Sequence, residues 1–352
     1  MGSLLCLGLV IVLTGVKRFR DWNFPILSYI RMFVIFLAVW IGGVAVSTDL
    51  NREKIIEMAT EAYYNHWDKV LDIAGKTKLA NPISTYYTNI ALSKQLQLGE
   101  RMMEFYQPFS SGLFLPANPE SDWFTIFSGS DVYYHIGDMN MAQHAAMLGM
   151  IFSPYQRSSR LIQRLIEVNM VNGDIPAAMK YIRMLESTLF HRKKAALFKE
   201  MALTHPAGDY PWLQNKREMV YKDDILRNSN NPQASLELLV KNSPANHAAL
   251  DYLLCFYLLN KDIPAFFNAY TLYCKGKSNY IPKVYAEALL IYFAATGNVT
   301  GKMQDYHINP DIIKAFNEYT RLYEDTNGNL EPVRDKFPHT YWLYYHFATT
   351  GK

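Results

Sequence analysis

The stretch Ile126–Pro154, IFSGSDVYYHIGDMNMAQHAAMLGMIFSP, indicates how this chain folds. Gly137-Asp138 divides it into two segments, because glycine readily ends a helix and aspartate readily begins one. Small residues in the two segments allow a pair of helices to approach closely, and Tyr133 can fill the gap to a neighbouring pair. The small residues are Ser130, Ala142, Ala146 and Gly149. The stretch therefore predicts a helical hairpin that is closed by Pro154.

Turn signals of the same kind recur along the chain. The intervals between them are 34, 38, 36, 88 and 36 residues, and the interval of 88 covers about two units. The pairs are Asn65-His66, Gly99-Glu100, Gly137-Asp138, Gly173-Asp174, Lys261-Asp262 and Gly297-Asn298. Three pairs are followed by a proline 17 residues after their first member, namely Pro82, Pro116 and Pro154. A period in the mid-thirties is typical of stacked helical hairpins.

From Asp49 onward, apolar residues recur at the helical spacing of three and four, and no convincing run has the alternation of a strand. Two sets that share a face are Ile162, Leu165, Ile166 and Met170, and Leu250, Leu253, Leu254 and Tyr257. We therefore predict an all-α fold, an α-solenoid of stacked helical hairpins over residues 49–352. Ser121-Asp122 and Asp311 are expected to begin helices, and Pro338–Thr349 to form a final helix that caps the array.

The unit Ile126–Pro154 resembles a tetratricopeptide repeat, in which small residues, an aromatic residue, a Gly-Asp-like turn and a closing proline occupy these positions. Later units keep fewer of these residues: Ala178 after Gly173, and Tyr257 before Lys261, with Phe266 where alanine is usual. The resemblance implies an α-solenoid whose concave face binds a peptide or a protein. The whole arrangement also resembles membrane-anchored proteins of Bacteroidota-type bacteria, a resemblance that implies no activity.

Two uncharged runs near the N-terminus predict a membrane hairpin over residues 1–48. The first span covers about 2–16 and the second about 26–47, and the second has the length that crosses a bilayer. The loop 17–31 between them carries the basic residues Lys17, Arg18, Arg20 and Arg31. The positive-inside rule places this loop in the cytoplasm. Residues 49–352 are then extracytoplasmic, and residues 1–48 contact lipid in the inner (cytoplasmic) membrane.

Two other interpretations of this segment remain open. The runs can be a pair of buried core helices, although few polar residues interrupt them. Alternatively, the second run is a signal peptide that is cut near Ala45-Val46-Ser47. The abrupt apolar start also leads us to expect that a longer multi-pass protein was clipped upstream of Met1.

Composition and charge exclude several classes of protein. The 352 residues include 35 basic and 32 acidic side chains, and the formal charge of +3 comes from residues 1–48. A neutral body lacks the basic surface that nucleic-acid binding requires, so no nucleic-acid partner is expected. With 50% hydrophobic and 19% charged residues the chain is not disordered, and three cysteines do not make a disulfide framework.

We predict no catalytic, cofactor-binding or metal site. Two pairs are spaced to share a helix face but lack a third metal ligand: His339 with His346, and Asp131 with His135. The only serine–glycine cluster, Phe127–Asp131, lacks the GxSxG elbow of serine hydrolases. Asp325–Glu331 imitates a calcium loop but has its glycine at the wrong position, so we expect an Asn-Gly turn.

Cysteines and tyrosines complete the predictions. Cys255 and Cys274 fall about 10 Å out of register across the predicted hairpin, so we expect two buried free thiols. Adjacent tyrosines are expected to place one ring in the core and one at the rim. These pairs are Tyr63-Tyr64, Tyr86-Tyr87, Tyr133-Tyr134 and Tyr344-Tyr345.

The leading hypothesis is a membrane-anchored, extracytoplasmic helical-repeat scaffold that binds a protein partner in the envelope and has no catalytic activity of its own. The alternative is an accessory domain of a larger polytopic membrane enzyme or transporter, with its chemistry in helices upstream of Met1. A third hypothesis is a glycan-binding groove lined by tyrosines.

Overall fold

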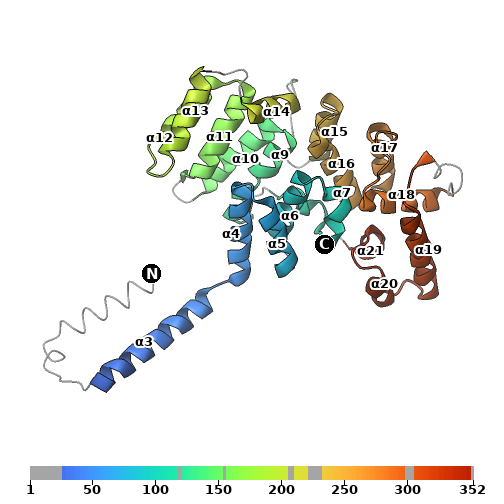
Figure 1. Ribbon diagram of the computed structural model, residues 1–352, viewed down its shortest axis with the longest axis horizontal. Coiled ribbons are helices and arrows are strands. Elements are labelled where there is room, and N and C mark those ends of the chain that lie inside the picture. Colours follow the sequence, from blue (N-terminus) through green and yellow to red (C-terminus); the bar gives the residue numbers. More distant parts are fainter. Residues whose placement is uncertain are drawn as a thin grey trace. The chain divides into compact units, whose positions relative to one another are not determined.

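The computed structural model describes residues 26–116, 121–153, 156–204, 210–220, 232–297 and 305–349. The chain forms two compact units, Met1–Glu53 (unit 1) and Lys54–Lys352 (unit 2). Every regular element in these described ranges is a helix, so the prediction of an all-α protein is confirmed (Figure 1). The predicted first span, about 2–16, lies outside the described residues, as does most of the basic loop 17–31.

Unit 1 contains the long helix α3 (Ile26–Ser47), which coincides with the second predicted span. Its part Ile30–Ser47 is long and apolar enough to cross a membrane, and none of it is buried inside the protein. It is the one helix of this kind in the part of the chain that the structure describes. Asp49 then begins α4 (Leu50–Tyr63) by accepting hydrogen bonds from the backbone N–H groups of the first helical turn.

Unit 2 contains the remaining helices of the described chain. Its first part includes α5 (Trp67–Thr77), α6 (Pro82–Lys94), α7 (Leu98–Arg101), η1 (Met102–Glu104), η2 (Phe109–Gly112), α8 (Trp123–Ser128), α9 (Ser130–Ile136), α10 (Met139–Phe152), α11 (Ser159–Asn172) and α12 (Ile175–Glu186). Its second part includes α13 (Arg192–Thr204), α14 (Pro211–Met219), α15 (Pro232–Asn242), α16 (His247–Leu259), α17 (Ile263–Tyr273), α18 (Lys283–Thr296), α19 (Pro310–Asp325), α20 (Leu330–Lys336) and α21 (Tyr341–Phe347).

Three of the predicted turns share one local structure. A residue with positive φ ends the first helix, and the aspartate after it donates its N–H to the carbonyl five residues earlier, as in the Schellman motif. The same aspartate begins the next helix by accepting a hydrogen bond from the N–H three residues later. The residues with positive φ are Gly137 (91°), Gly173 (80°) and Lys261 (59°), followed by Asp138, Asp174 and Asp262. The helical hairpins predicted at these turns are therefore confirmed.

Of the other helix ends predicted from the sequence, some are confirmed and others differ. Asn65 has a positive φ between α4 and α5, and Asp122 directly precedes α8, as predicted. Gly297 ends α18, but its partner Asn298 lies outside the described residues. Asp311 does not cap α19: the helix begins at Pro310, two residues before the expected Ile312, and Asn309 caps it.

The turn predicted at Gly99-Glu100 is wrong. The chain reverses earlier, where Leu96 has a φ of 57°, and Gly99 lies inside α7. A Cβ atom at Gly99 would come within 2.5 Å of the Tyr285 ring, so this glycine permits a close approach between helices rather than a turn.

The predicted proline register is confirmed at Pro82 and wrong at Pro116. Pro82 begins α6, where Asn81 caps the helix, but Pro116 begins no helix and Pro154 lies outside the described residues. Prolines do stand in the first turn of several other helices, at positions set by each helix rather than by a constant interval. These helices are α12, α14, α17 and α19.

Neighbouring helices pack against each other through most of unit 2, for example α10 on α11, α11 on α12 and α12 on α13. Helix α16 also packs against α6, α7 and α9, and α18 packs against α7 and α21. A simple solenoid has contacts only between adjacent repeats. The helical hairpins are therefore joined by additional contacts between segments far apart in the sequence (Figure 1).

The final helix α21 covers the ends of earlier helices. The Tyr341 hydroxyl donates to the carbonyl of Leu258, and the Trp342 indole N–H donates to the carbonyl of Glu287. Both aromatic rings are almost completely buried. The predicted packing role of this segment is consistent with these contacts, although the helix is shorter than Pro338–Thr349 because His339 has a positive φ that precedes its start.

The structure tests the predictions for the cysteines and for one pair of tyrosines. Cys255 and Cys274 are free, as predicted, and Cys255 is buried, whereas Cys274 is only partly buried, so the expectation of two buried thiols is wrong for Cys274. Tyr86 and Tyr87 are both completely buried, so the expectation of one inner and one outer ring is wrong for this pair. The reason is that α6 is buried on all sides, from Ser84 to Ser93.

Candidate functional site

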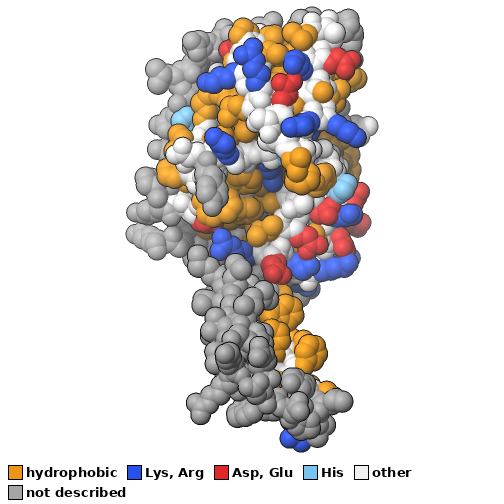
Figure 2. Space-filling view, turned by 90° about the vertical axis from the view of Figure 1, so that its left-hand side faces the viewer, with side chains coloured by type: hydrophobic (Ala, Val, Ile, Leu, Met, Phe, Trp, Pro, Cys, Tyr) orange, Lys and Arg blue, Asp and Glu red, His pale blue; other side chains and the backbone are white. Residues whose placement is uncertain are grey.

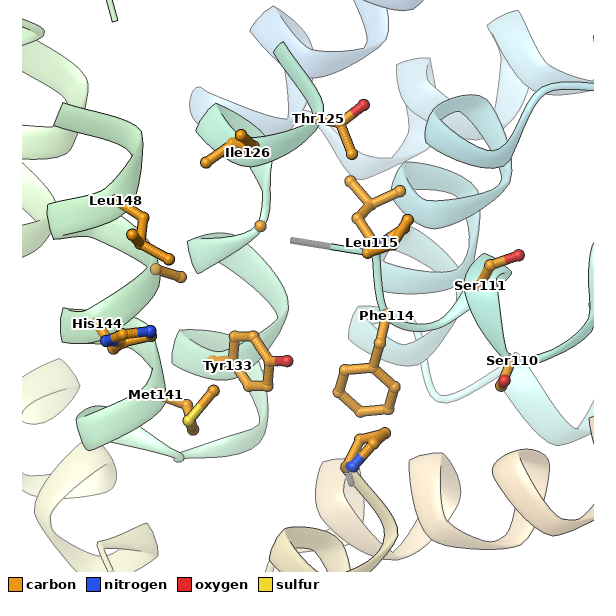
Figure 3. Close-up of a pocket in the computed structure, with 14 residues that line it drawn as sticks. Ser110, Ser111, Phe114, Leu115, Thr125, Ile126, Tyr133, Met141, His144 and Leu148 are labelled. Atoms are coloured by element: carbon orange, nitrogen blue, oxygen red, sulfur yellow. The ribbon is translucent and has the colours of Figure 1, made fainter. Parts of the chain in front are cut away.

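A pocket of about 360 Å³ lies in unit 2 between η2, α8, α9 and α10. Met141, Tyr133 and Leu148 project from one side, and Phe114 and Leu115 project from the other (Figure 3). Most of the lining is apolar. The polar side chains of the lining are Ser110, Ser111, Thr125, Tyr133 and His144.

Buried amide groups hold one wall of this pocket in place. The side chains of Asn89 and Gln107 form two reciprocal hydrogen bonds of 3.1 and 3.2 Å. Asn89 also donates to the carbonyl of Gly112 at 2.9 Å, and Gln107 donates to the carbonyl of Met102 at 2.8 Å. The segment between η1 and η2 is therefore fixed to α6 by satisfied polar groups, which are costly to separate when buried.

Aromatic contacts fix the other end of this wall. The Phe114 ring lies 5.6 Å from the Tyr133 ring, 5.8 Å from the Tyr252 ring and 6.4 Å from the Phe256 ring, measured between ring centroids. Such tilted and edge-to-face pairs contribute to stability beyond the area that they bury. These ring contacts tie the Phe114 side of the pocket to α9 and α16.

The lining residues determine what the pocket can bind. None of the described lining residues is Asp, Glu, Lys, Arg or Cys, so the polar groups of the lining are hydroxyls and one imidazole. Burial raises the pKa of Tyr133 to about 12, so its hydroxyl stays protonated and can donate a hydrogen bond. An apolar side chain or short peptide segment with few hydrogen bonds fits this chemistry.

A network of charged side chains lies behind the pocket, between α9 and α11. Asp131 accepts from Arg160 at 2.5 Å through one carboxylate oxygen and from Arg164 at 3.0 Å through the other. Arg164 also donates to Glu167 at 2.7 Å, and its guanidinium lies 3.8 Å from the centroid of the Tyr134 ring. Burial alone would raise the pKa of Asp131, but the two guanidinium groups outweigh it and hold this pKa below its usual range.

Two further cationic groups approach the same network. The ammonium group of Lys216 donates to the carbonyls of Tyr134 and His135 at 2.6 and 2.9 Å, which satisfies the C-terminal end of α9. Burial, together with the charges of Lys94 and Arg164, lowers the pKa of Lys216 well below its usual range. Lys216 thus ties α14 to α9, and the ion pairs of Asp131 tie α11 to α9, which is the one of these three helices that lines the pocket.

The structure separates the residue pairs that the sequence suggested as partial metal sites. Asp131 points to the two arginines, whereas His135 contacts the hydroxyl of Ser93 at 2.8 Å. His339 precedes α21 and His346 lies within it, so these two histidines do not share a helix face. In the described chain no three His, Cys, Asp or Glu side chains are grouped as metal ligands.

The serine–glycine cluster and the calcium-like loop also have structural explanations. Ser128 and Ser130 are buried at the junction of α8 and α9, and the carbonyl of Ser128 accepts a hydrogen bond from the Tyr86 hydroxyl. Asn327 and Gly328 both have positive φ and form the expected turn between α19 and α20.

The sequence did not predict the roles of Arg160, Arg164 and Lys216. A usable signal was the spacing of the two arginines, which lie one helical turn apart on α11 beside Glu167. Asp131, the carboxylate that the two arginines share, lies 29 residues before Arg160 in the sequence. It reaches the arginines only because α9 packs on its neighbouring helices.

Comparison with models of protein families matches residues 2–348 of this chain to a family described as a family of unknown function (DUF6057). No curated protein matches the chain, and no solved structure matches it.

Proposed function

We propose that this chain, which belongs to the DUF6057 family, is a membrane-anchored helical-repeat scaffold that mediates protein–protein interaction in the cell envelope. In this proposal residues 1–48 contact membrane lipid, and the tetratricopeptide-like hairpins of residues 49–352 lie outside the cytoplasm and bind a protein partner. No catalytic activity, cofactor or nucleic acid is part of the proposal.

The observation that carries this proposal is the pocket between η2 and α8–α10. It is mainly apolar, and its polar lining groups are hydroxyls and one imidazole rather than charged side chains. Clefts of this chemistry accept apolar anchor residues of a partner while a few polar groups set their orientation. The confirmed helical hairpins support the resemblance to peptide-binding helical repeats.

The apolar helix α3 supports the anchoring part of the proposal. Its segment Ile30–Ser47 has no burial within the protein, so its apolar surface has no partner in the described chain. A bilayer would remove that surface from water. The basic residues that precede it in the sequence favour an extracytoplasmic position for unit 2.

The proposal is tested by a crosslinked pull-down from native membranes with the tagged full chain as bait. The test variant is Leu148→Arg, which places a charge in the pocket at a partly buried position of α10. The matched control is Leu197→Arg on α13, where the leucine side chain is 51% exposed and outside the pocket.

We expect one dominant partner to be recovered with the wild type and with Leu197→Arg, and to be lost with Leu148→Arg. An unpaired charge in an apolar site is costly, so the variant should weaken a partner that inserts an apolar residue there by at least about tenfold. Recovery of the same partner with Leu148→Arg would show that the pocket is not its binding site. Recovery of the bait alone would contradict the scaffold.

A further inference from the structure

A second surface of unit 2 carries exposed apolar side chains on the turn between α12 and α13. The turn Ser187–His191 joins α12 to α13, and its Leu189 and Phe190 are 75% and 88% exposed. The hydroxyls of Ser187 and Thr188 both donate to carbonyls of the last turn of α12, at 2.7 Å. These bonds fix the backbone that presents Leu189 and Phe190 to solvent.

Further apolar groups lie at the start of α11 and at the C-terminal end of α10. Leu189, Phe190 and Arg157 line a shallow depression of about 480 Å³ between the start of α11 and this turn. Ile151 and Phe152, at the C-terminal end of α10, are 59% and 51% exposed. Exposed apolar side chains gathered in this way are typical of an interaction surface.

Basic side chains surround these apolar groups. Arg192, Lys193 and Lys194 directly follow the turn, and Arg157 is exposed on the neighbouring connection. No acidic residue occurs between Ser187 and Lys199. Figure 2 views the side on which α12 and α13 lie and shows Lys and Arg side chains, with some Asp and Glu, interspersed with apolar ones. Apolar side chains flanked by cations are the pattern of proteins that rest on an anionic bilayer.

The chain tethers this surface to α3 through a short segment. Tyr63 follows Ser47 by only 16 residues. Its hydroxyl donates to the side chain of Gln163 at 2.6 Å and lies 3.4 Å from the ammonium group of Lys194. A chain spans at most about 3.5 Å per residue, so a membrane that holds α3 keeps the turn at a high effective concentration near its surface.

We propose that the apolar–basic turn Leu189–Lys194 docks onto the anionic headgroup region of the bilayer that holds α3. Leu189 and Phe190 insert among the lipid chains near the headgroups, while Arg192 and Lys193 bind phosphate groups. This inference rests on the membrane anchoring by α3 in the proposed function, but it does not depend on the pocket between η2 and α10.

The test uses the full chain in lipid nanodiscs that hold one chain each, so a second copy cannot supply the contact. Cys6→Ser and Cys274→Ser leave Cys255, which is buried. A cysteine replaces Leu189 and is labelled with the environment-sensitive dye NBD. The matched control places the same label at Leu272 on α17, which is 70% exposed.

In bilayers of phosphatidylcholine mixed with phosphatidylglycerol, we expect the label at position 189 to brighten and to be quenched by lipids with a nitroxide on the acyl chain. The label at position 272 should show neither effect. Arg192→Gln with Lys193→Gln should lower the ratio of docked to undocked chain by about 30-fold, which is the factor that two cations contribute at an anionic surface. Lys241→Gln with Lys277→Gln removes the same charge from α15 and from the connection after α17, and should leave the ratio unchanged.

Equal emission from the two labels in both neutral and anionic bilayers would overturn the inference. A signal at position 189 that does not respond to the loss of Arg192 and Lys193 would also overturn it. Either result leaves the pull-down with Leu148→Arg unaffected, so failure of this inference is distinguishable from failure of the scaffold. Release of the chain from membranes by alkaline carbonate would overturn both.

Discussion

At the scale of single residues, two contacts lead us to expect that small changes in unit 2 lower its stability. Gly99 lies where α7 meets α18, and Asp131 lies where α9 meets α11. Each position brings together segments that are far apart in the sequence. A substitution at either position therefore tests the long-range contacts that distinguish this fold from a stack of independent hairpins.

The substitution Gly99→Ala should destabilise the protein. The new Cβ atom would lie 2.5 Å from the ring of Tyr285, which is buried and donates a hydrogen bond to Asp251 at 3.1 Å. Overpacking of this kind costs about 1–3 kcal/mol. The free energy of unfolding in denaturant should fall by that amount.

The control for this prediction is Gly75→Ala in α5. No atom lies within 4 Å of a Cβ at this position, and alanine favours a helix more than glycine does, so stability should stay constant or rise by up to about 1 kcal/mol. Equal effects of the two substitutions would contradict the close packing of α7 on α18.

The substitution Asp131→Asn should also be destabilising, because it leaves Arg160 and Arg164 without their shared carboxylate. The side chains of the two arginines are only 19% and 18% exposed. Removing one partner of a largely buried ion pair costs about 2–4 kcal/mol. Asp72→Asn removes the partner of Lys76 in an exposed pair and should cost less than about 1 kcal/mol. Denaturant unfolding of both variants, compared with the wild type, provides the measurement.

At the scale of helices, the sequence could predict the hairpins but not their assembly. The turns at Gly137, Gly173 and Lys261 depend on local chemistry, namely a residue that tolerates positive φ followed by an aspartate that caps the next helix. The tetrapeptide Asp-Ile-Pro-Ala occurs at both 174–177 and 262–265 and is a stronger repeat signal than the proline spacing.

The pocket and the charged side chains near it could not be predicted from local sequence patterns. They depend on contacts such as Asp131 with Arg160, or Asn89 with Gly112, which no local pattern specifies. Burial of α6 on all sides likewise depends on α16 and other helices distant in the sequence. The prediction for Tyr86 and Tyr87 was wrong for that reason.

The cap that Asp262 forms at the start of α17 should contribute to the stability of the protein. Asp262→Ala should lower the free energy of unfolding by about 1 kcal/mol, because the N–H of Ala265 loses its acceptor at the start of α17. Asp262→Asn should retain most of the stability, since asparagine caps helices about as well. If the two variants lose the same stability, the carboxylate contributes by charge rather than by capping.

The attachment of α21 should depend on pH. Glu287 on α18 is 1% exposed and accepts a hydrogen bond of 2.6 Å from the backbone N–H of Tyr341. Burial raises the pKa of Glu287 to about 7, above its value of about 4.3 in the unfolded chain. The contribution of the protonated group is fully present below pH 4.3 and is lost as the pH rises through 7.

Glu287→Gln imitates the protonated group and keeps an oxygen for the N–H of Tyr341. It should therefore be more stable than the wild type at pH 8, by up to about 3 kcal/mol, and similar to it near pH 4. Denaturant unfolding at the two pH values measures the difference. A variant that is less stable than the wild type at pH 8 would show that the ionised carboxylate is the favoured form.

At the scale of the whole molecule, the proposed topology can be tested with the full chain that carries Cys6→Ser and Cys274→Ser. Leu272→Cys is exposed on unit 2, and a membrane-impermeant maleimide should label it in sealed right-side-out vesicles but not in inside-out vesicles. Labelling only in inside-out vesicles would place unit 2 in the cytoplasm and contradict the envelope scaffold.

The central claim is that the pocket between η2 and α8–α10 holds a protein partner at the membrane. The most direct measurement is photocrosslinking in living cells from p-benzoylphenylalanine at position 148, which lines the pocket, with position 197 on α13 as the control. We expect one discrete adduct from position 148, recovered with the membranes, and no such adduct from position 197. The absence of any adduct at position 148, or the same adduct from both positions, would contradict it.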